Sequence, residues 1–317
     1  MKPESKKNML LLFNPASGVR NFSGHLFEVV DRFTAAGFLV TVYPTQAPGE
    51  VSAIIAAYAE GYDCLVCSGG DGTIGEAIGA LLSLEKRPAF GLIPSGTVND
   101  FAVSLGIPKD ALLAADNIIN GAPGALDIGL FGDRHFSYVA AFGLFTDVSY
   151  ATPQNIKNLL GKLAYFFEGV KRFASIESFR CEFVLDGEVV YGDFVLGIVG
   201  NAHSIAGIKL PAEMGAQMDD GLFEVILIQR PGTFKDHQEI MTSLLTHEIK
   251  TDLLTIRKAK KISFTSSVPV AWTLDGDFGG EYTEASIENL HHALEVIVPA
   301  RKAADFAVKT TDAGGRA

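Results

Sequence analysis

Cysteine and long apolar runs are scarce in this 317-residue chain, and both shortages exclude classes of protein. Its three cysteines are an odd number, so they cannot all pair in disulfide bonds. Cys64 and Cys67 form a C-x-x-C, which occurs in redox and zinc sites, but the apolar run CLVC favours a buried strand and no second ligand pair follows. A membrane-spanning helix needs roughly 20 apolar residues, and the best run, near 138–145, is short and interrupted by Gly143. We therefore expect a soluble, reduced, cytoplasmic protein without a transmembrane segment.

Positive charge is also in short supply. The chain has 26 Lys and Arg side chains against 37 Asp and Glu, which gives a net charge of −11. A broad basic surface is therefore absent, and we expect no binding of nucleic acid. Hydrophobic residues make up 48% and charged residues 20%, a balance that excludes a largely disordered chain. The length predicts two domains or one large one.

The first part of the chain alternates strands with helices, which predicts a parallel sheet covered by helices on both faces. Apolar runs predict strands at 9–13, 38–43, 64–67 and 89–93. Apolar residues at helical spacing predict helices at 23–36, 50–60 and 74–84.

Near Ala125 the pattern changes to shorter apolar runs with more turn residues, which predicts a second, β-rich domain. Asp186-Gly187 lies between two strand candidates and indicates a hairpin. We place the domains at 1–127 and 128–300, with a C-terminal tail at 301–317. Strands are expected at 179–185, 189–199, 223–229, 261–265, 270–274 and 294–298, and helices at 155–173 and 234–245.

The strongest local motif is SGGDGTIGEAI at 68–78, which follows a strand and opens a helix. Its glycines let the backbone approach a ligand closely, and the helix N-terminus favours phosphate. Asp71 would repel phosphate unless Mg²⁺ lies between them; alternatively, Asp71 and Thr73 only cap the helix. The spacing fits neither a Walker A loop nor a Rossmann fingerprint.

Two further glycine turns, NPASG at 14–18 and IPSGTVNDFA at 93–102, also follow strands. All three turns are expected at the carboxyl edge of the parallel sheet, where open α/β sheets bind ligands. By itself, the second turn is equally consistent with a helix N-cap.

Together these motifs resemble the diacylglycerol kinase catalytic-domain family, and more closely its soluble bacterial lipid kinase branch. The resemblance continues through LDIG at 126–129, MDDGLFEV at 218–225 and LDGD at 274–277, and it covers nearly the whole chain. The GGDGT loop is shared with NAD kinases, so specificity comes from the ordered set.

The resemblance implies a three-layer α/β nucleotide-binding domain followed by a β-sandwich domain, with the active site in the cleft. It also implies an ATP-dependent lipid kinase that uses Mg²⁺ and most readily phosphorylates diacylglycerol, giving phosphatidic acid. By position, the residues assigned to ATP are Asn14, Pro15, Ala16, Ser17, Gly18, Thr45, Gly70, Asp71, Gly72, Thr73, Ile74, Gly75, Glu76 and Thr97.

The same resemblance assigns the carboxylates. Asp275 matches the catalytic base, although L-D-G is also common turn chemistry. Asp71, Asp100 and Asp127 match a network that holds Mg²⁺ through water, and Asp277 takes the place of a family Glu. A second, structural Mg²⁺ matches Asp220 with the carbonyls of Gln217 and Leu222, although Asp219-Asp220-Gly221 also suits a plain solvated turn. The metal ligands are thus Gln217, Asp220, Leu222 and Asp277.

Two residues depart from the family pattern: Gly75 stands where Asn is usual, and Asp277 replaces Glu. Either change would reduce activity or alter metal preference. Two alternatives to a lipid kinase therefore stay open. One is a NAD kinase-like enzyme, and the other is a non-catalytic nucleotide or lipid sensor.

A lipid kinase must reach the membrane surface, and two basic segments bear on this. The segment 155–173 has the lysines and phenylalanines of a helix for an anionic membrane surface, although packing on the second domain is favoured. RKAKK at 257–261 is expected to be a solvated strand end, and His291-His292 to be surface residues. Transient membrane association is expected, and a homodimer stays open.

Overall fold

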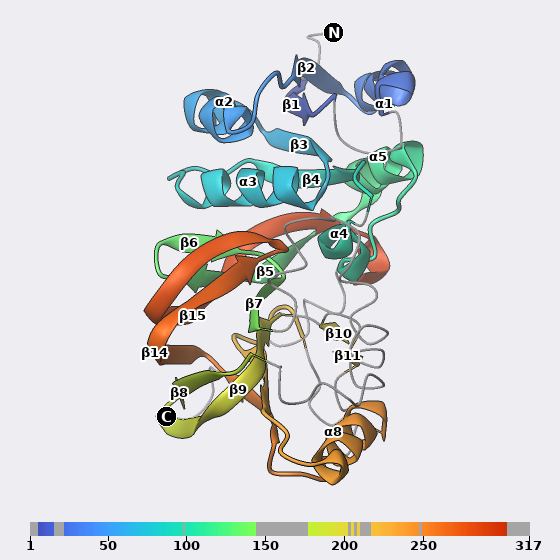
Figure 1. Ribbon diagram of the computed structural model, residues 1–317. Helices are drawn as coiled ribbons and strands as arrows, with labels where there is room; N and C mark the ends of the chain where they lie inside the picture. The colour runs from blue at the N-terminus through green and yellow to red at the C-terminus, as the bar shows by residue number, and fades with distance from the viewer. Residues whose placement is uncertain are drawn as a thin grey trace, which may run out of the picture. The chain divides into compact units, whose positions relative to one another are not determined.

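The computed structural model describes residues 6–15, 22–97, 99–143, 177–201, 204–205, 208–209, 217–246 and 249–302. The chain forms two compact units, drawn in Figure 1. The first unit consists of Met1–Leu126 together with His292–Ala317, and the second of Asp127–His291.

The first unit contains a parallel sheet in the order β4-β3-β1-β2. Its strands are β1 (Lys7–Phe13), β2 (Phe38–Pro44), β3 (Cys64–Gly69) and β4 (Ala89–Pro94), as the apolar runs predict. The register aligns Phe13 with both Pro44 and Ser68, and Gly69 with Pro94. The carboxyl ends of all four strands therefore lie level along one edge.

Helices cover both faces of this sheet. α1 (Phe22–Ala35) packs with α5 (Ala111–Asn120), and α2 (Glu50–Tyr58) packs with α3 (Asp71–Leu82), as Figure 1 shows. Right-handed crossovers between parallel strands place these two pairs on opposite faces. The expected start of α3 at Ile74 is wrong, because the helix begins directly after the glycines, at Asp71.

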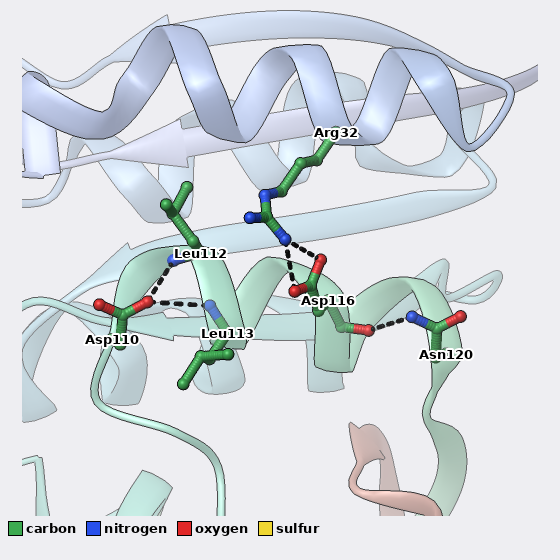
Figure 2. A network of polar contacts seen from close by, with 6 residues as sticks. All are labelled: Arg32, Asp110, Leu112, Leu113, Asp116 and Asn120. Atoms are coloured by element: carbon green, nitrogen blue, oxygen red, sulfur yellow. Dashed lines mark hydrogen bonds and ion pairs between the residues drawn. The ribbon is translucent and has the colours of Figure 1, made fainter.

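Two polar contacts fix α5, which the sequence pattern did not single out (Figure 2). The carboxylate of Asp110 caps the helix by accepting the backbone N–H groups of Leu112 and Leu113, both at 3.0 Å. The guanidinium of Arg32 in α1 pairs with the carboxylate of Asp116 in α5. These contacts set the start of α5 and its attachment to α1.

The C-x-x-C pair lies in β3, as the apolar run predicts, and it cannot chelate one metal ion. Cys64 and Cys67 are an odd number of residues apart on a strand, so their side chains face opposite sides of the sheet. Burial raises the pKa of each thiol to about 12. Both thiols are therefore protonated at neutral pH.

This burial predicts how the cysteines react. In the native protein we expect Cys64, Cys67 and Cys181, all 3% exposed or less, to resist an aromatic disulfide reagent at pH 8. All three should react once the chain is unfolded in denaturant. Rapid labelling of one thiol in the native state would contradict the buried placement.

The second unit is a β-sandwich. Its long strands β9 (Glu188–Gly200) and β14 (Lys261–Leu274) each pair with β8 (Phe179–Leu185) over one half and with β7 (Val139–Gly143) over the other. This switching encloses an aromatic core, whose largest members are Phe131, Phe136, Phe142, Phe183, Phe194, Phe223, Phe264 and Trp272. The Asp186-Gly187 hairpin is confirmed by the pairing of Leu185 with Glu188.

The remaining described elements are divided between the two units. β12 (Phe223–Gln229) pairs with β9, β13 (Leu254–Ala259) pairs with β12 at the edge of the sheet, and α8 (Phe234–Thr246) connects the two strands. The others are α4 (Asp100–Ser104), the 3-10 turn η1 (Ala59–Gly61), β5 (Ala122–Phe131), β6 (Arg134–Phe136), β10 (Ser204–Ile205) and β11 (Ile208–Lys209).

The last two strands are longer than the sequence predicts. β15 (Asp277–Val298) is 22 residues long. Only its end, at 294–298, is rich enough in apolar residues to predict a strand, because the earlier part is mostly polar and has few buried positions. The expected strands at 261–265 and 270–274 are likewise one strand, β14, with an irregularity between Thr265 and Val270.

The end of β15 also belongs to the first unit, whereas the sequence pattern groups it with the second. Val296 pairs in parallel with Phe90 of β4, which adds a fifth strand to the first sheet. The guanidinium of Arg87 donates to the carbonyl of Ala293 at 2.5 Å. These contacts explain why His292–Val298 clusters with the first unit.

Within the described ranges, no helix is long and apolar enough to cross a membrane. The expected helix at 155–173 and the tail from 303 onward lie outside the described residues.

Candidate active site

Backbone hydrogen bonds continue past the strand ends of the first sheet and align the loops that follow. The N–H of Asn14 donates to the carbonyl of Ser68 at 3.1 Å, and that of Thr45 to the carbonyl of Phe13 at 2.9 Å. The N–H of Ser95 donates to the carbonyl of Gly69 at 2.9 Å. The loops that follow β1, β2, β3 and β4 are thus joined at one edge, where the sequence predicts the three glycine turns.

The two longer glycine loops touch through their backbones. A Cβ placed on Gly96 would lie 2.5 Å from the Cα of Gly70, and one on Gly70 would lie 3.3 Å from the Cα of Gly96. No side chain fits at Gly96 unless the loops separate. Such close backbone packing leaves N–H groups near the surface where a ligand would bind.

Asp71 holds these loops together. Its carboxylate accepts the N–H of Asn99 at 2.8 Å and that of Phe101 at 3.4 Å, so it caps α4 rather than its own helix. The N-cap of α3 is Gly70, which forms no side-chain cap. The N-terminus of α3 therefore has no capping side chain that would compete with an anion.

Asn99 shapes the second glycine loop. It is 4% exposed and adopts a left-handed φ of 58°, a conformation that Asn tolerates better than most residues. Its amide accepts the N–H of Gly96 at 2.9 Å and donates to the carbonyl of Gly96 at 2.7 Å. The loop is thus closed on itself beside Gly70.

The other residues assigned to ATP differ in their surroundings. The carboxylate of Glu76 accepts the N–H of Ser52 at 2.9 Å, so it anchors α2 to α3. Ile74 is only 5% exposed and contributes to the core. Thr45 is buried, whereas Pro15, Gly72 and Thr97 are exposed and Asn14, Thr73 and Gly75 are half-buried. Ala16, Ser17 and Gly18 lie outside the described residues, as does the side chain of Asp100.

In the second unit, Asp275 lies in the hairpin between β14 and β15. Asp275 and Gly276 have positive φ of 52° and 93°, so the turn chemistry suggested by L-D-G is present. The carboxylate is held by residues 137–139, which lead into β7. It accepts the N–H groups of Ser137, Tyr138 and Val139 at 2.7, 2.8 and 3.0 Å, and the hydroxyl of Ser137 at 2.9 Å.

Burial raises the pKa of the Asp275 carboxyl above its ordinary value, and the four donors oppose part of that rise. A half-buried carboxylate with a raised pKa accepts a proton more readily than an exposed one. Asp186 offers a comparison, since it occupies a similar hairpin at φ 48° and accepts the N–H groups of Lys260 and Lys261, both at 2.8 Å. The geometry of the turn is therefore the same at both residues. Asp275 differs from Asp186 in its burial, because Asp186 is exposed.

Removing the Ser137 hydroxyl should change the pKa of the Asp275 carboxyl. In Ser137→Ala the carboxylate loses one donor that favours its charged form, so its pKa rises further. We expect the acid limb of the pH–rate profile to move to higher pH, while the rate well above that limb stays close to wild type. A fall in rate by the same factor at every pH would mean that Ser137 only supports the fold.

Asp127 lies in β5 and is fully buried. One carboxylate oxygen accepts the N–H of Gly221 at 2.6 Å, and the other contacts Nδ1 of His291 at 2.9 Å. Its own N–H donates to the carbonyl of Met218 at 2.8 Å. Asp127 therefore holds the MDDG turn against β5, and half-exposed His291 has a partner that a bare surface residue would lack.

The turn assigned to a second metal ion is already engaged. One oxygen of Asp220 accepts the N–H of Leu222 at 3.1 Å, and the other lies 2.6 Å from the ammonium of Lys258. Gln217 and Leu222 are half-buried in the same turn, whereas Asp277 is exposed at the Asp275 hairpin. The carboxylate of Asp220, expected to bind a metal ion, is already paired with the ammonium of Lys258. The turn is therefore a poor fit for Mg²⁺.

Asn201 links these two regions, and no local sequence signal identifies it. Its N–H donates to the carbonyl of Tyr138 at 3.1 Å, and its amide donates to the carbonyl of Asp127 at 2.9 Å. Because Tyr138 also donates to Asp275, one chain of hydrogen bonds connects Asp275 to Asp127. Sequence reasoning missed Ser137, Asn201, His291 and Lys258, whose partners are set by tertiary contacts.

Comparison with known families agrees with this two-part architecture. Residues 8–131 match the model of the diacylglycerol kinase catalytic domain. Residues 140–298 match the model of the YegS C-terminal NAD kinase beta sandwich-like domain. The expected combination of an α/β domain with a β-sandwich domain is confirmed.

Relatives extend the similarity over nearly the whole chain. A diacylglycerol kinase of Bacillus subtilis is 31% identical over 299 residues, which cover 94% of this chain and 98% of that protein. One of Staphylococcus carnosus is 35% identical, covering 93% and 96%. A Bacillus anthracis crystal structure aligns with a TM-score of 0.77 at 26% identity, covering 94% of this chain and 99% of that chain. The chain belongs to the diacylglycerol kinase family, and it is a kinase.

Proposed function

We propose that this chain transfers the γ-phosphate of ATP to the hydroxyl of diacylglycerol and so produces phosphatidic acid. The observation that carries the proposal is the backbone contact between Gly70 and Gly96 at the N-terminus of α3. Glycine loops at a helix N-terminus bind phosphate through N–H groups and the helix dipole. The first unit would thus hold the triphosphate.

Asp71 is the residue of the first unit best placed to work with a divalent cation. One carboxylate oxygen accepts the N–H of Asn99 and the other accepts that of Phe101, and a carboxylate oxygen can also accept a hydrogen bond from a metal-bound water. A bound Mg²⁺ would neutralise the triphosphate and the charge that develops in transfer. Asp71 would bind this ion through water while it keeps the second loop in position.

Asp275 would supply the proton acceptor. Phosphoryl transfer needs an acceptor oxygen that loses its proton as the new P–O bond forms. Asp275 would take the proton of the lipid hydroxyl, the hydroxyl oxygen would bond to the γ-phosphorus, and the bond to the bridging oxygen would break, releasing ADP. Ser137, Tyr138 and Val139 would orient the carboxylate through their backbone N–H groups.

The identity of the acceptor rests on the relatives, which are named diacylglycerol kinases. Diacylglycerol resides in membranes, so the enzyme would have to work at a membrane surface. The segment 155–173, with its lysines and phenylalanines, would serve such contact.

The experiment is a transfer assay with γ-labelled ATP and Mg²⁺. The acceptors are diacylglycerol, phosphatidylglycerol and sphingosine in mixed micelles, with NAD as a soluble acceptor. Label is expected in diacylglycerol, and much less in the other acceptors. Asp275→Asn serves as the inactive control.

Two results would contradict the proposal. Label in NAD but in none of the lipids would indicate a NAD kinase-like enzyme. ATP binding by calorimetry without label in any acceptor would favour a nucleotide sensor. Label confined to another lipid would keep the lipid kinase and change its substrate.

A further inference from the structure

The ammonium of Lys258 lies between two carboxylates of the second unit. Its Nζ is 2.6 Å from Oδ2 of Asp220 and 3.5 Å from Oε1 of Glu224. The three side chains are 20%, 14% and 0% exposed, respectively. Lys258 belongs to the basic run expected to be a solvated strand end, so this placement corrects that expectation.

Strand register places the three charges together. Glu224 in β12 pairs directly with Lys258 in β13, and opposite charges at directly paired positions attract. Asp220 lies just before β12, in a turn that Gly221 closes at a positive φ of 78°. The turn is itself held by Asp127, whose carboxylate accepts the N–H of Gly221. The ammonium is thus fixed by a sheet on one side and a buried turn on the other.

A divalent cation at this turn would compete with that ammonium. Asp220 is the only carboxylate in the ligand set within the turn, and its Oδ2 is taken by Lys258. Its Oδ1 accepts the N–H of Leu222, which already orients the group. A metal ion bound to either oxygen would lie close to the ammonium in a partly buried site, where like charges repel strongly.

We infer that the Lys258 ammonium is the resident cation of the MDDG turn and that this chain binds no divalent metal ion at Asp220. The side chain would do permanently what a structural metal ion does when bound, neutralising Asp220 and the fully buried Glu224. The stability of the second unit would then be independent of free Mg²⁺.

Thermal unfolding of the nucleotide-free protein tests the inference. The wild-type midpoint should be the same in EDTA and in millimolar MgCl₂. In Lys258→Met, which keeps the apolar stem and removes the charge, the midpoint in EDTA should fall by on the order of 10 °C. Millimolar Mg²⁺ should recover part of that loss, because the freed carboxylates would then bind the ion.

Lys261→Met is the matched control. Lys261 begins β14, the next strand along the chain. Its side chain is 67% exposed and pairs with Glu288 at 3.0 Å, so its loss should change neither the midpoint nor the response to Mg²⁺. The inference does not depend on which acceptor is phosphorylated, since the assay contains neither nucleotide nor lipid.

One result would overturn the inference outright. If Mg²⁺ raises the midpoint of the wild-type protein, and Asp220→Asn abolishes that rise, a metal ion binds at the turn. This comparison stands even if Lys258→Met does not fold. Calorimetric titration of Mn²⁺ into wild type and Asp220→Asn gives a second readout, and the same heats in both would support the inference.

Discussion

Replacing Asp275 by Asn should lower the rate of phosphate transfer by about 10²–10⁴-fold, the usual contribution of a general base. The amide is nearly isosteric but cannot accept the proton. ATP affinity should be unchanged, because the residues assigned to ATP lie in the first unit. The variant should also lose some stability, since its NH₂ group cannot accept from the N–H groups that the carboxylate now satisfies. Transfer assays and thermal unfolding measure the two effects separately.

Asp186→Asn is the control for this variant. Asp186 occupies the same kind of Asp-Gly hairpin, and its carboxylate also accepts two backbone N–H groups. Its replacement should cost less stability, because the exposed Asp186 satisfies two donors rather than four, and it should leave the transfer rate unchanged. If both variants lose activity equally, the effect of Asp275 is structural; wild-type rates in Asp275→Asn would remove it from the mechanism.

Replacing Gly96 by Ala should weaken ATP binding by roughly tenfold or more. The added methyl would lie 2.5 Å from the Cα of Gly70 and 2.8 Å from Oδ1 of Asn99, so the two loops must move apart. Overpacking of this kind costs about 1–3 kcal/mol, and 1.4 kcal/mol is a factor of ten in affinity. Because the obstacle is backbone, no side-chain rearrangement relieves it. Calorimetric titration with ATP and Mg²⁺ gives the affinity.

Gly79→Ala is the matched control in the same unit. Gly79 lies within α3, and an added Cβ there would meet nothing within 4 Å. Alanine stabilises a helix relative to glycine, so this variant should bind ATP normally and unfold at the same or a higher temperature. Unchanged ATP affinity in Gly96→Ala would mean that the loop contact does not shape the nucleotide site.

Local sequence patterns were sufficient for the first sheet and its loops. Strands such as β1 and β3 are buried on both faces and therefore appear as continuous apolar runs. Glycine turns directly after those runs identified the loops at the carboxyl edge. The Asp-Gly pair at 186–187 sufficed for its hairpin, because that turn type requires residues that tolerate positive φ.

Long-range pairing was beyond the reach of these patterns. The first part of β15 is mostly exposed or half-buried, so no apolar run marks it. The role of Asp71 as the cap of α4 depends on Asn99 and Phe101, which follow a different strand. The sequence predicts that Lys258 is exposed like its basic neighbours, and only the strand register shows that it lies opposite Glu224. In each case the partner lies far along the chain, and only the fold decides which one it is.

The path of β15 has a consequence for synthesis on the ribosome. The first unit takes its fifth strand from residues 292–298, and the entire second unit is translated before them. Until then β4 has an open edge, with backbone N–H and C=O groups exposed to other chains. The nascent protein thus carries an incomplete sheet through most of its elongation, and a ribosome stalled before residue 292 leaves a product prone to edge-to-edge association.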